Sequence, residues 1–173
     1  GKYIDNTDIP RTLFSLWPEK EQTIKNFILM VSDGWGYNQV LATNYYEGKT
    51  QTYERFPVIV PMSTYPGRKG NDKVENALGL YTTGYNSYKA WTDFDYVNQD
   101  YTDSAPAASA MATGEKLYDR ALNVKIEDSS PLITLPQVAA QKGKSGGAVT
   151  SVELSHAPPA GLGGAHNPAR KSY

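Results

Sequence analysis

A serine at the start of a run of small residues is the feature of this sequence best suited to covalent chemistry. Residues 103–114 read Asp-Ser-Ala-Pro-Ala-Ala-Ser-Ala-Met-Ala-Thr-Gly, and we predict a helix over 105–113 that Gly114 ends. Ser104 then lies near unpaired backbone N–H groups and the positive end of the helix, a place that stabilises a phosphate dianion. A simple N-cap is the commoner explanation for an isolated Asp-Ser, but the length and composition of this run make it more specific.

An aspartate in a glycine-rich turn is the second candidate. Residues 32–36 read Ser-Asp-Gly-Trp-Gly and follow an apolar run at 26–31 that is typical of a strand buried on both faces. A carboxylate held directly after a buried strand suits a hard divalent cation, so Asp33 is a candidate metal ligand. Taken alone the motif is weak, because Asp-Gly turns are common and are more often purely structural.

Two histidines and an arginine form the third candidate group. His156 follows a predicted strand, and His166 and Arg170 come shortly after it. Arginine is the natural bidentate clamp for a phosphate. A lone histidine is more often structural than a ligand, and a single arginine is most often a solvated surface residue. These residues therefore indicate a functional site only when they are considered together.

The order of the predicted elements indicates how these groups could meet. Apolar runs predict strands at 26–31, 58–60 and 148–152, and helical signals predict helices at 38–46, 105–113 and 134–141. This order is typical of an α/β fold with a mainly parallel central sheet flanked by helices. Because chemistry gathers at the carboxyl ends of parallel strands, we expect Asp33 and His156 to face the same crevice. Residues 67–103 are expected to form a long surface loop.

The composition excludes several other classes of protein. The 173 residues have the length of one ordinary domain, preceded by an irregular arm that we place at 1–22. A net charge of -1 argues against a broad cationic surface for nucleic acid or anionic lipid. The chain has no cysteine, so disulfides and thiolate metal sites are excluded. No apolar run approaches the roughly 18 residues needed to span a membrane.

Together the three segments resemble the alkaline phosphatase family. The family's strand followed by Asp-Gly-x-Gly resembles residues 27–36, and its nucleophile signature, Asp-Ser-Ala followed by small residues and Thr-Gly, resembles residues 103–114 without a gap. A third family block that ends in an arginine resembles residues 150–170. The resemblance is weak between these blocks. It implies that residues 23–173 are an incomplete, N-terminal part of a single alkaline-phosphatase-like α/β catalytic domain.

The resemblance implies metal-dependent hydrolysis of phosphate monoesters through a phosphoserine intermediate on Ser104. Two zinc ions and one magnesium ion are the implied cofactors. Asp33 would bridge a zinc and the magnesium site, Ser104 would bind that zinc, and His156 would face the magnesium site. Arg170 would hold two nonbridging phosphate oxygens, and Asp103 would orient Arg170.

Three departures from the family pattern bear on these roles. Trp35 stands where the family usually has a smaller apolar residue. The spacing from His156 to Arg170 is one residue longer than in familiar members. Pro158 stands where a serine or threonine hydroxyl usually contacts the magnesium site, which puts the shell of that ion in doubt.

The sequence stops at Tyr173, whereas most zinc ligands of the family come from its C-terminal half. With two histidines the chain cannot supply the usual zinc sites, so we expect that it needs the C-terminal remainder, as a continuation or as a second chain. The resemblance also implies a periplasmic or secreted location and a homodimer, although some relatives are monomers. No nucleic-acid or membrane partner is expected.

Two other interpretations remain open from the sequence. A phosphodiesterase or sulfatase of the same superfamily would have a similar fold, but these enzymes commonly use threonine or a modified residue as nucleophile. A non-catalytic extracellular binding module could use the 13 tyrosines and 3 tryptophans as a contact surface, but it leaves residues 103–114 unexplained.

Overall fold

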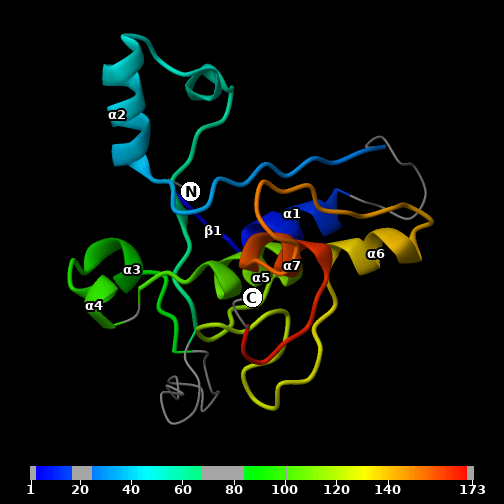
Figure 1. The fold of residues 1–173 in the computed structure, drawn as a ribbon. Helices are drawn as coiled ribbons and strands as arrows, with labels where there is room; N and C mark the ends of the chain where they lie inside the picture. The colour runs from blue at the N-terminus through cyan, green and yellow to red at the C-terminus, as the bar shows by residue number, and fades with distance from the viewer. Residues whose placement is uncertain (1–2, 17–24, 68–83, 100, 171–173) are drawn as a thin grey trace.

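The computed structural model describes residues 3–16, 25–67, 84–99 and 101–170. The central body of this part is formed by α1 (Asp8–Ser15), α5 (Ser104–Thr113), α6 (Leu135–Gln141) and α7 (Ala157–Gly163). Figure 1 shows these helices gathered around α5, with a helical projection above them and the small helices α3 (Lys89–Thr92) and α4 (Tyr96–Gln99) to one side.

The helix α5 packs closely because its sequence consists almost wholly of small residues. Every residue from 105 to 112 is buried. The neighbouring helix α7 places Gly161 against Ala108, so closely that a Cβ added to Gly161 would lie 3.0 Å from the Ala108 Cβ. Gly114 ends α5 in the left-handed conformation, with a φ of 80°. The predicted helix, its close packing and its glycine end are confirmed.

The chain that follows α5 supplies most of the apolar core. One cluster comes from this segment alone, with Leu132 packed against it, and consists of Leu117, Tyr118, Ala121, Val124 and Ile126. A second cluster joins α5 to α7 through Ala105, Leu122, Ala157 and Ala160. The core of the described residues therefore forms around α5.

A parallel pair of two-residue strands, β1 (Ile4–Asp5) and β2 (Met62–Ser63), is the sheet found in the described residues. The prediction of an irregular arm over 1–22 is wrong for the part that holds β1 and α1. Asn6 and Pro10 in this segment are fully buried, so it belongs to the core rather than to a surface extension.

The three strands predicted from apolar runs are wrong for this chain. Residues 26–31, 58–60 and 148–152 run without helix or strand, and Ile28 and Met30 are 83% and 89% exposed. A parallel strand buried on both faces needs a neighbouring strand on each side, and none of these runs finds one among the described residues. The fold class is correct in its coarse form, helices with a small parallel sheet, but the residues that the structure describes do not form a mainly parallel central sheet.

Helices with clear capping signals were predicted correctly. The structure places α2 (Tyr37–Glu47) over the predicted 38–46. The helix α6 begins after Thr134, whose backbone N–H donates to the Gln137 side chain at 2.9 Å. The helices α1 and α7 were not predicted. The loop predicted over 67–103 includes α3 and α4, and its residues 68–83 and 100 lie outside the described residues.

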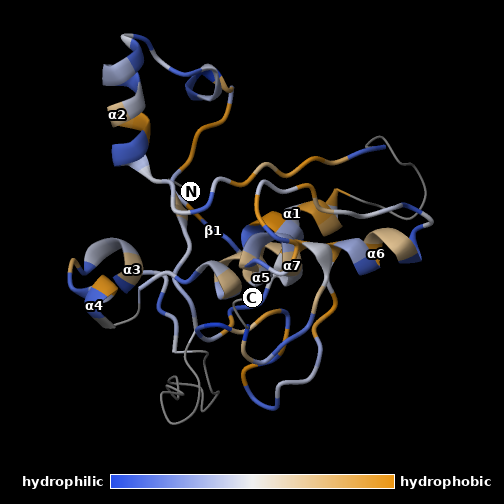
Figure 2. Ribbon diagram, viewed as in Figure 1, coloured by the Kyte–Doolittle hydropathy of each residue, from blue (hydrophilic) through white to orange (hydrophobic). Residues whose placement is uncertain are grey.

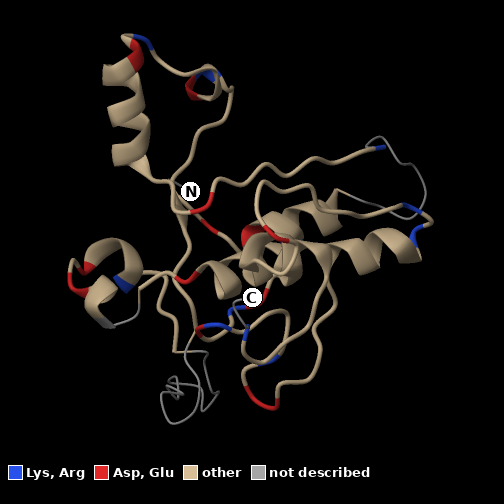
Figure 3. Cartoon of the chain, viewed as in Figure 1, with Lys and Arg blue, Asp and Glu red and all other residues tan. Residues whose placement is uncertain are grey.

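The helix α2 and the short 3-10 helix η1 (Thr52–Arg55) form the projection, in which no residue of either helix is buried. Figure 2 shows polar and apolar residues mixed along it, and Figure 3 shows its charged residues at the far end of α2 and at η1. Trp35 packs edge-on against Tyr53, with ring centroids 4.8 Å apart. No helix in the described residues is long and apolar enough to cross a lipid bilayer.

A groove of about 660 Å³ lies between the body helices and two extended segments. Residues 25–31 and 144–151 run side by side along it (Figure 1), and the Lys144 Nζ donates to the Lys25 carbonyl at 2.8 Å. Two of the predicted strands therefore lie next to each other, although they do not form a ladder.

Candidate active site

Ser104 is the first residue of α5, and Asp103 before it adopts an extended conformation at the helix N-cap. The Ala107 N–H donates to the Asp103 carbonyl at 3.1 Å. The Asp103 side chain makes no capping hydrogen bond to α5, although aspartate is a favoured capping residue. Its carboxylate turns instead toward two other segments of the chain, and these build the site.

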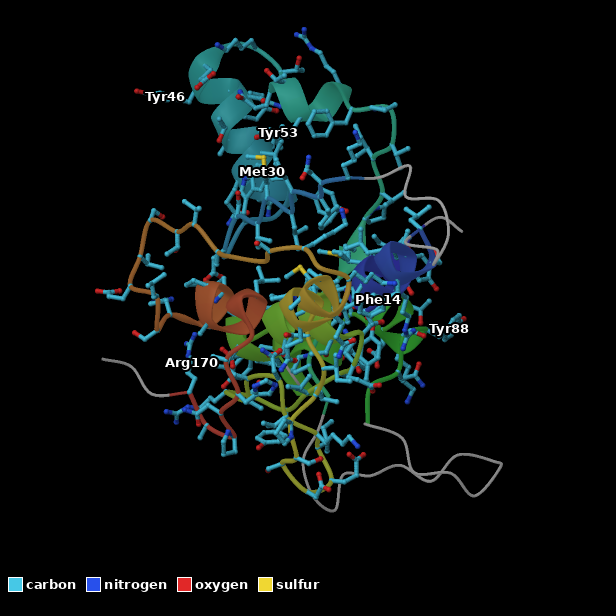
Figure 4. The ribbon with its side chains drawn as sticks, turned by 90° about the vertical axis from the view of Figure 1, so that its right-hand side faces the viewer. Phe14, Met30, Tyr46, Tyr53, Tyr88 and Arg170 are labelled. Atoms are coloured by element: carbon cyan, nitrogen blue, oxygen red, sulfur yellow. The ribbon has the colours of Figure 1, made fainter. Side chains whose placement is uncertain are left out.

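Arg170 contacts both of the residues at the start of α5. Its Nη1 donates a hydrogen bond to the Ser104 Oγ at 2.9 Å, and its Nη2 lies 3.8 Å from the Asp103 Oδ1. Figure 4 shows Arg170 below α7, away from Tyr46 and Tyr53 on the projection. A guanidinium group beside a hydroxyl oxygen stabilises negative charge that develops there, and it offers paired donors to phosphate oxygens. The predicted Asp103, Ser104 and Arg170 thus come together.

Residue 120 joins the two members of the ion pair through its backbone. The Arg120 N–H donates to the Asp103 Oδ2 at 2.6 Å, and the Arg170 N–H donates to the Arg120 carbonyl at 2.7 Å. The Arg120 Nη2 also donates to the Arg170 carbonyl at 3.4 Å. Arg120 was missed from the sequence, because a role played by the backbone leaves no signal in the residue type.

The remaining predicted site residues lie elsewhere on the surface of the chain. Asp33 is exposed in the turn before α2, where Gly34 has a φ of 68°. His156 is the exposed N-cap residue of α7, with no side-chain capping bond. His166, the other histidine, hydrogen-bonds through Nε2 to the Leu132 carbonyl at 2.8 Å, which is a structural role.

Comparison with known proteins identifies the family of the chain. The family model described as alkaline phosphatase matches residues 24–173. The chain belongs to the alkaline phosphatase family. It is 32% identical over 152 residues to alkaline phosphatase 3 of Bacillus subtilis (strain 168), and 36% identical over 150 residues to alkaline phosphatase H of Pseudomonas aeruginosa (strain UCBPP-PA14). These alignments cover 88% and 86% of this chain but 28% and 27% of the relatives.

The alkaline phosphatase of Escherichia coli (strain K12) matches similarly, with 34% identity over 154 residues. Among solved structures, alkaline phosphatase from the Antarctic bacterium TAB5 superposes with a TM-score of 0.52 at 24% identity, over 81% of this chain and 32% of that one. This likeness concerns the fold, and it agrees with a partial alkaline-phosphatase-like α/β architecture. The chain spans little more than a quarter of the length of the curated relatives it matches.

Asn123 holds α5 and α7 together next to the candidate site. Its side chain is fully buried, and its Nδ2 donates to the Gly161 and Ala165 carbonyls at 2.8 and 2.7 Å. Its backbone N–H donates to the Ser109 Oγ on α5 at 3.0 Å. The hydrogen bonds of Asn123 therefore fix α7 and the segment leading to Arg170 against the helix that begins at Ser104.

A buried charged cluster lies at the other end of α5. The Lys116 Nζ donates to the Asn6 Oδ1 at 2.8 Å and to the Tyr65 carbonyl at 2.7 Å, and it lies 3.1 Å from the Asp5 Oδ1. The Asn6 Nδ2 in turn donates to the Ala107 carbonyl in α5 at 3.3 Å. The Tyr85 hydroxyl donates to the Asp5 carboxylate. This cluster holds the N-terminal segment against α5.

Burial governs the protonation of this cluster. It lowers the pKa of Lys116 to about 8, against the opposing attraction of Asp5. Burial, together with the hydrogen bond to Asp5, raises the pKa of Tyr85. Burial also acts to raise the pKa of Asp5, but Lys116 and the hydrogen bonds outweigh it and keep that pKa below 3.8.

The described residues do not by themselves make a metal site. No group of three or more His, Asp or Glu side chains in this part of the chain is arranged to hold an ion. Pro158, in the first turn of α7, brings no side-chain ligand atom. A zinc or magnesium ion does not fit the residues present without further ligands.

Proposed function

We propose that this chain is the N-terminal part of a phosphate monoester hydrolase that forms a phosphoserine intermediate on Ser104. The observation that supports this most directly is the hydrogen bond from Arg170 to the Ser104 Oγ at the start of α5. This hydrogen bond brings a serine hydroxyl and a guanidinium group into contact, in a chain whose relatives are named alkaline phosphatases.

In the proposed reaction Arg170 binds two nonbridging oxygens of the phosphate and Ser104 attacks the phosphorus. The bond from Oγ to phosphorus forms while the bond to the alcohol oxygen breaks; the serine hydroxyl loses its proton and the departing alcohol oxygen gains one. Water then hydrolyses the phosphoserine, which releases phosphate and restores the serine hydroxyl. Charge spreads over the equatorial oxygens in a loose transition state, where a positioned arginine stabilises it. Asp103 orients Arg170, because its two oxygens lie against Arg170 and the Arg120 N–H.

We further propose two zinc ions and one magnesium ion as cofactors of the completed enzyme. Asp33, Ser104 and His156 are this chain's proposed contributions, and the other ligands come from the remainder of the fold. The exposed apolar runs at 26–31, 58–60 and 148–152 support the idea that further strands pair with them. The remainder would be a continuation of the chain or a second polypeptide. A periplasmic or secreted location and a homodimer are part of the same proposal.

The phosphoserine is tested by trapping it at acid pH in the completed enzyme after brief exposure to labelled para-nitrophenyl phosphate. Ser104→Ala should abolish the trapped label, because the attacking oxygen is gone. Ser87→Ala, which alters another exposed serine, should leave the label intact. A labelled peptide that does not contain residue 104 would refute the assignment. Faster hydrolysis of a phosphodiester or a sulfate ester than of the monoester would refute the monoester class.

A further inference from the structure

Arg120 occupies a backbone conformation that its residue type disfavours. Its φ is 67°, in the left-handed region where glycine and asparagine are accommodated most easily. The conformation serves the site, because it directs the N–H of this residue to Asp103 and its carbonyl to the Arg170 N–H. Glycine could make the same backbone contacts with less conformational strain. The presence of arginine at this position therefore suggests that its side chain has a function.

The charges around Arg120 indicate such a function. Asp103 already uses its Oδ1 toward Arg170 and its Oδ2 toward the Arg120 N–H, so both carboxylate oxygens are occupied. Asp103 is therefore paired with the guanidinium of Arg170, whereas the guanidinium of Arg120 contacts the Arg170 backbone carbonyl and not that carboxylate.

The guanidinium of Arg120 is also weakly held. It is exposed, and its hydrogen bond to the Arg170 carbonyl is 3.4 Å long, beyond the usual range of about 2.7–3.2 Å for this kind of bond. A charge-assisted bond to a carboxylate or phosphate is shorter and about twice as strong as a bond between neutral groups. An anionic group near the Arg170 backbone would therefore displace that carbonyl from Arg120 readily.

We propose that Arg120 is a specificity-determining residue that favours phosphate monoesters whose alcohol part carries a second anionic group. Arg170 binds the phosphate that is transferred to Ser104, and Arg120 binds the second anion at the rim of the site. The inference rests on the proposed function. It names a class of substrates that the proposed roles of Ser104 and Arg170 do not specify.

The test compares 3-phosphoglycerate with glycerol 3-phosphate, which differ by one carboxylate, as substrates of the completed enzyme. The wild type should hydrolyse the carboxylate-bearing substrate with the higher kcat/KM. Arg120→Asn, which keeps a residue that accepts the left-handed backbone, should lower this preference roughly tenfold through the loss of one charged hydrogen bond. The change should come mainly from weaker binding, as a raised KM for the carboxylate-bearing substrate with little change in kcat. Arg120→Lys should retain part of the preference, since it keeps the charge.

Lys125→Asn is the matched control, because it removes one exposed positive charge from the chain segment that follows Arg120. It should leave the preference unchanged. The inference is overturned if the wild type treats the two substrates alike, or if Arg120→Asn and Lys125→Asn change the preference equally. Failure to hydrolyse either substrate would instead refute the proposed function, and the inference with it.

Discussion

At the scale of single residues, the position of the Asp103 carboxylate decides what the site can do. The side chain could have capped α5, and that is the usual use of an aspartate before a helix. It lies instead 2.6 Å from the Arg120 N–H and 3.8 Å from Arg170. Ser104 is therefore the first residue of the helix, and the Arg170 guanidinium is held where it donates a hydrogen bond to the Ser104 Oγ.

The proposed binding of phosphate by Arg170 predicts a specific loss of phosphate affinity. In the completed enzyme, Arg170→Ala should weaken competitive inhibition by inorganic phosphate by about 1.5–3 kcal/mol, the value of a charged hydrogen bond. The measurement is the inhibition constant against para-nitrophenyl phosphate, with thermal melting to check the fold. Arg55→Ala, which removes an exposed arginine from η1 on the projection, should leave inhibition unchanged. Equal inhibition of wild type and Arg170→Ala would show that another residue holds the phosphate.

Asp103, Ser104 and Arg170 were predictable because their residue types carry the chemistry and recur in recognisable blocks. Arg120 and Asn123 were not predictable. Arg120 acts through its backbone groups, and a single asparagine in the sequence gives no sign that its side chain is buried between two helices. Asp33 and His156 stay predictions as metal ligands, because the described residues assemble no metal site around them.

At the scale of elements, the helices were more predictable than the strands for a physical reason. The start of α6 at Thr134 and the end of α5 at Gly114 are set by hydrogen bonds within a few residues of each helix end. A strand needs a partner that is distant in sequence. The runs at 26–31 and 58–60 have the right composition for strands but no partner in the described residues.

The contact between α5 and α7 predicts a sharp difference between two glycines of one helix. Gly161→Ala would put a Cβ 3.0 Å from the Ala108 Cβ, so it should lower the free energy of unfolding by about 1–3 kcal/mol through overpacking. Gly163→Ala would meet the Ala148 Cβ at 3.9 Å, an ordinary contact, and should be neutral or slightly stabilising. Denaturant unfolding of both variants measures this. Equal stability of the two would contradict the close packing of α5 against α7.

At the scale of the whole molecule, charged and polar contacts tie distant segments to α5. The cluster around Lys116 joins the N-terminal strand, the segment at Tyr65 and Tyr85, and through Asn6 it also bonds to the Ala107 carbonyl in α5. It was not predictable, because Lys116 and Asp5 are far apart in sequence and each resembles a surface residue. Their side chains are 6% and 16% exposed, so their charges are part of the interior.

This cluster predicts how stability changes at alkaline pH. The folded protein releases the Lys116 proton at about pH 8, whereas the unfolded chain keeps it up to the ordinary pKa of 10.5. Between these values the unfolded state binds more protons, so the contribution of Lys116 to the free energy of unfolding rises with pH, by at most about 3 kcal/mol. The raised pKa of Tyr85 makes the free energy of unfolding fall as the pH rises near pH 10 and above. The effect of Lys116 is therefore best measured below pH 10.

Urea unfolding of the completed enzyme at pH values of about 7, 8 and 9 would measure the effect. Lys116→Met removes the titrating group, so the rise should be smaller in that variant. Lys125→Met, at an exposed site, should behave as the wild type. Identical pH dependence in all three proteins would mean that Lys116 does not release its proton in this range.

The attachment of Arg170 has a consequence for how the chain can vary in length. Leu122 and Asn167 exchange two backbone hydrogen bonds, Tyr118 donates to the Pro168 carbonyl, and the Arg120 carbonyl accepts the Arg170 N–H. The arginine is thus located by docking onto residues 118–122, and not by counting from His156. Because these hydrogen bonds and not the length of the connection locate Arg170, the segment after α7 could gain or lose a residue and still leave the guanidinium against Ser104. Insertions and deletions are therefore expected to be tolerated in this connection.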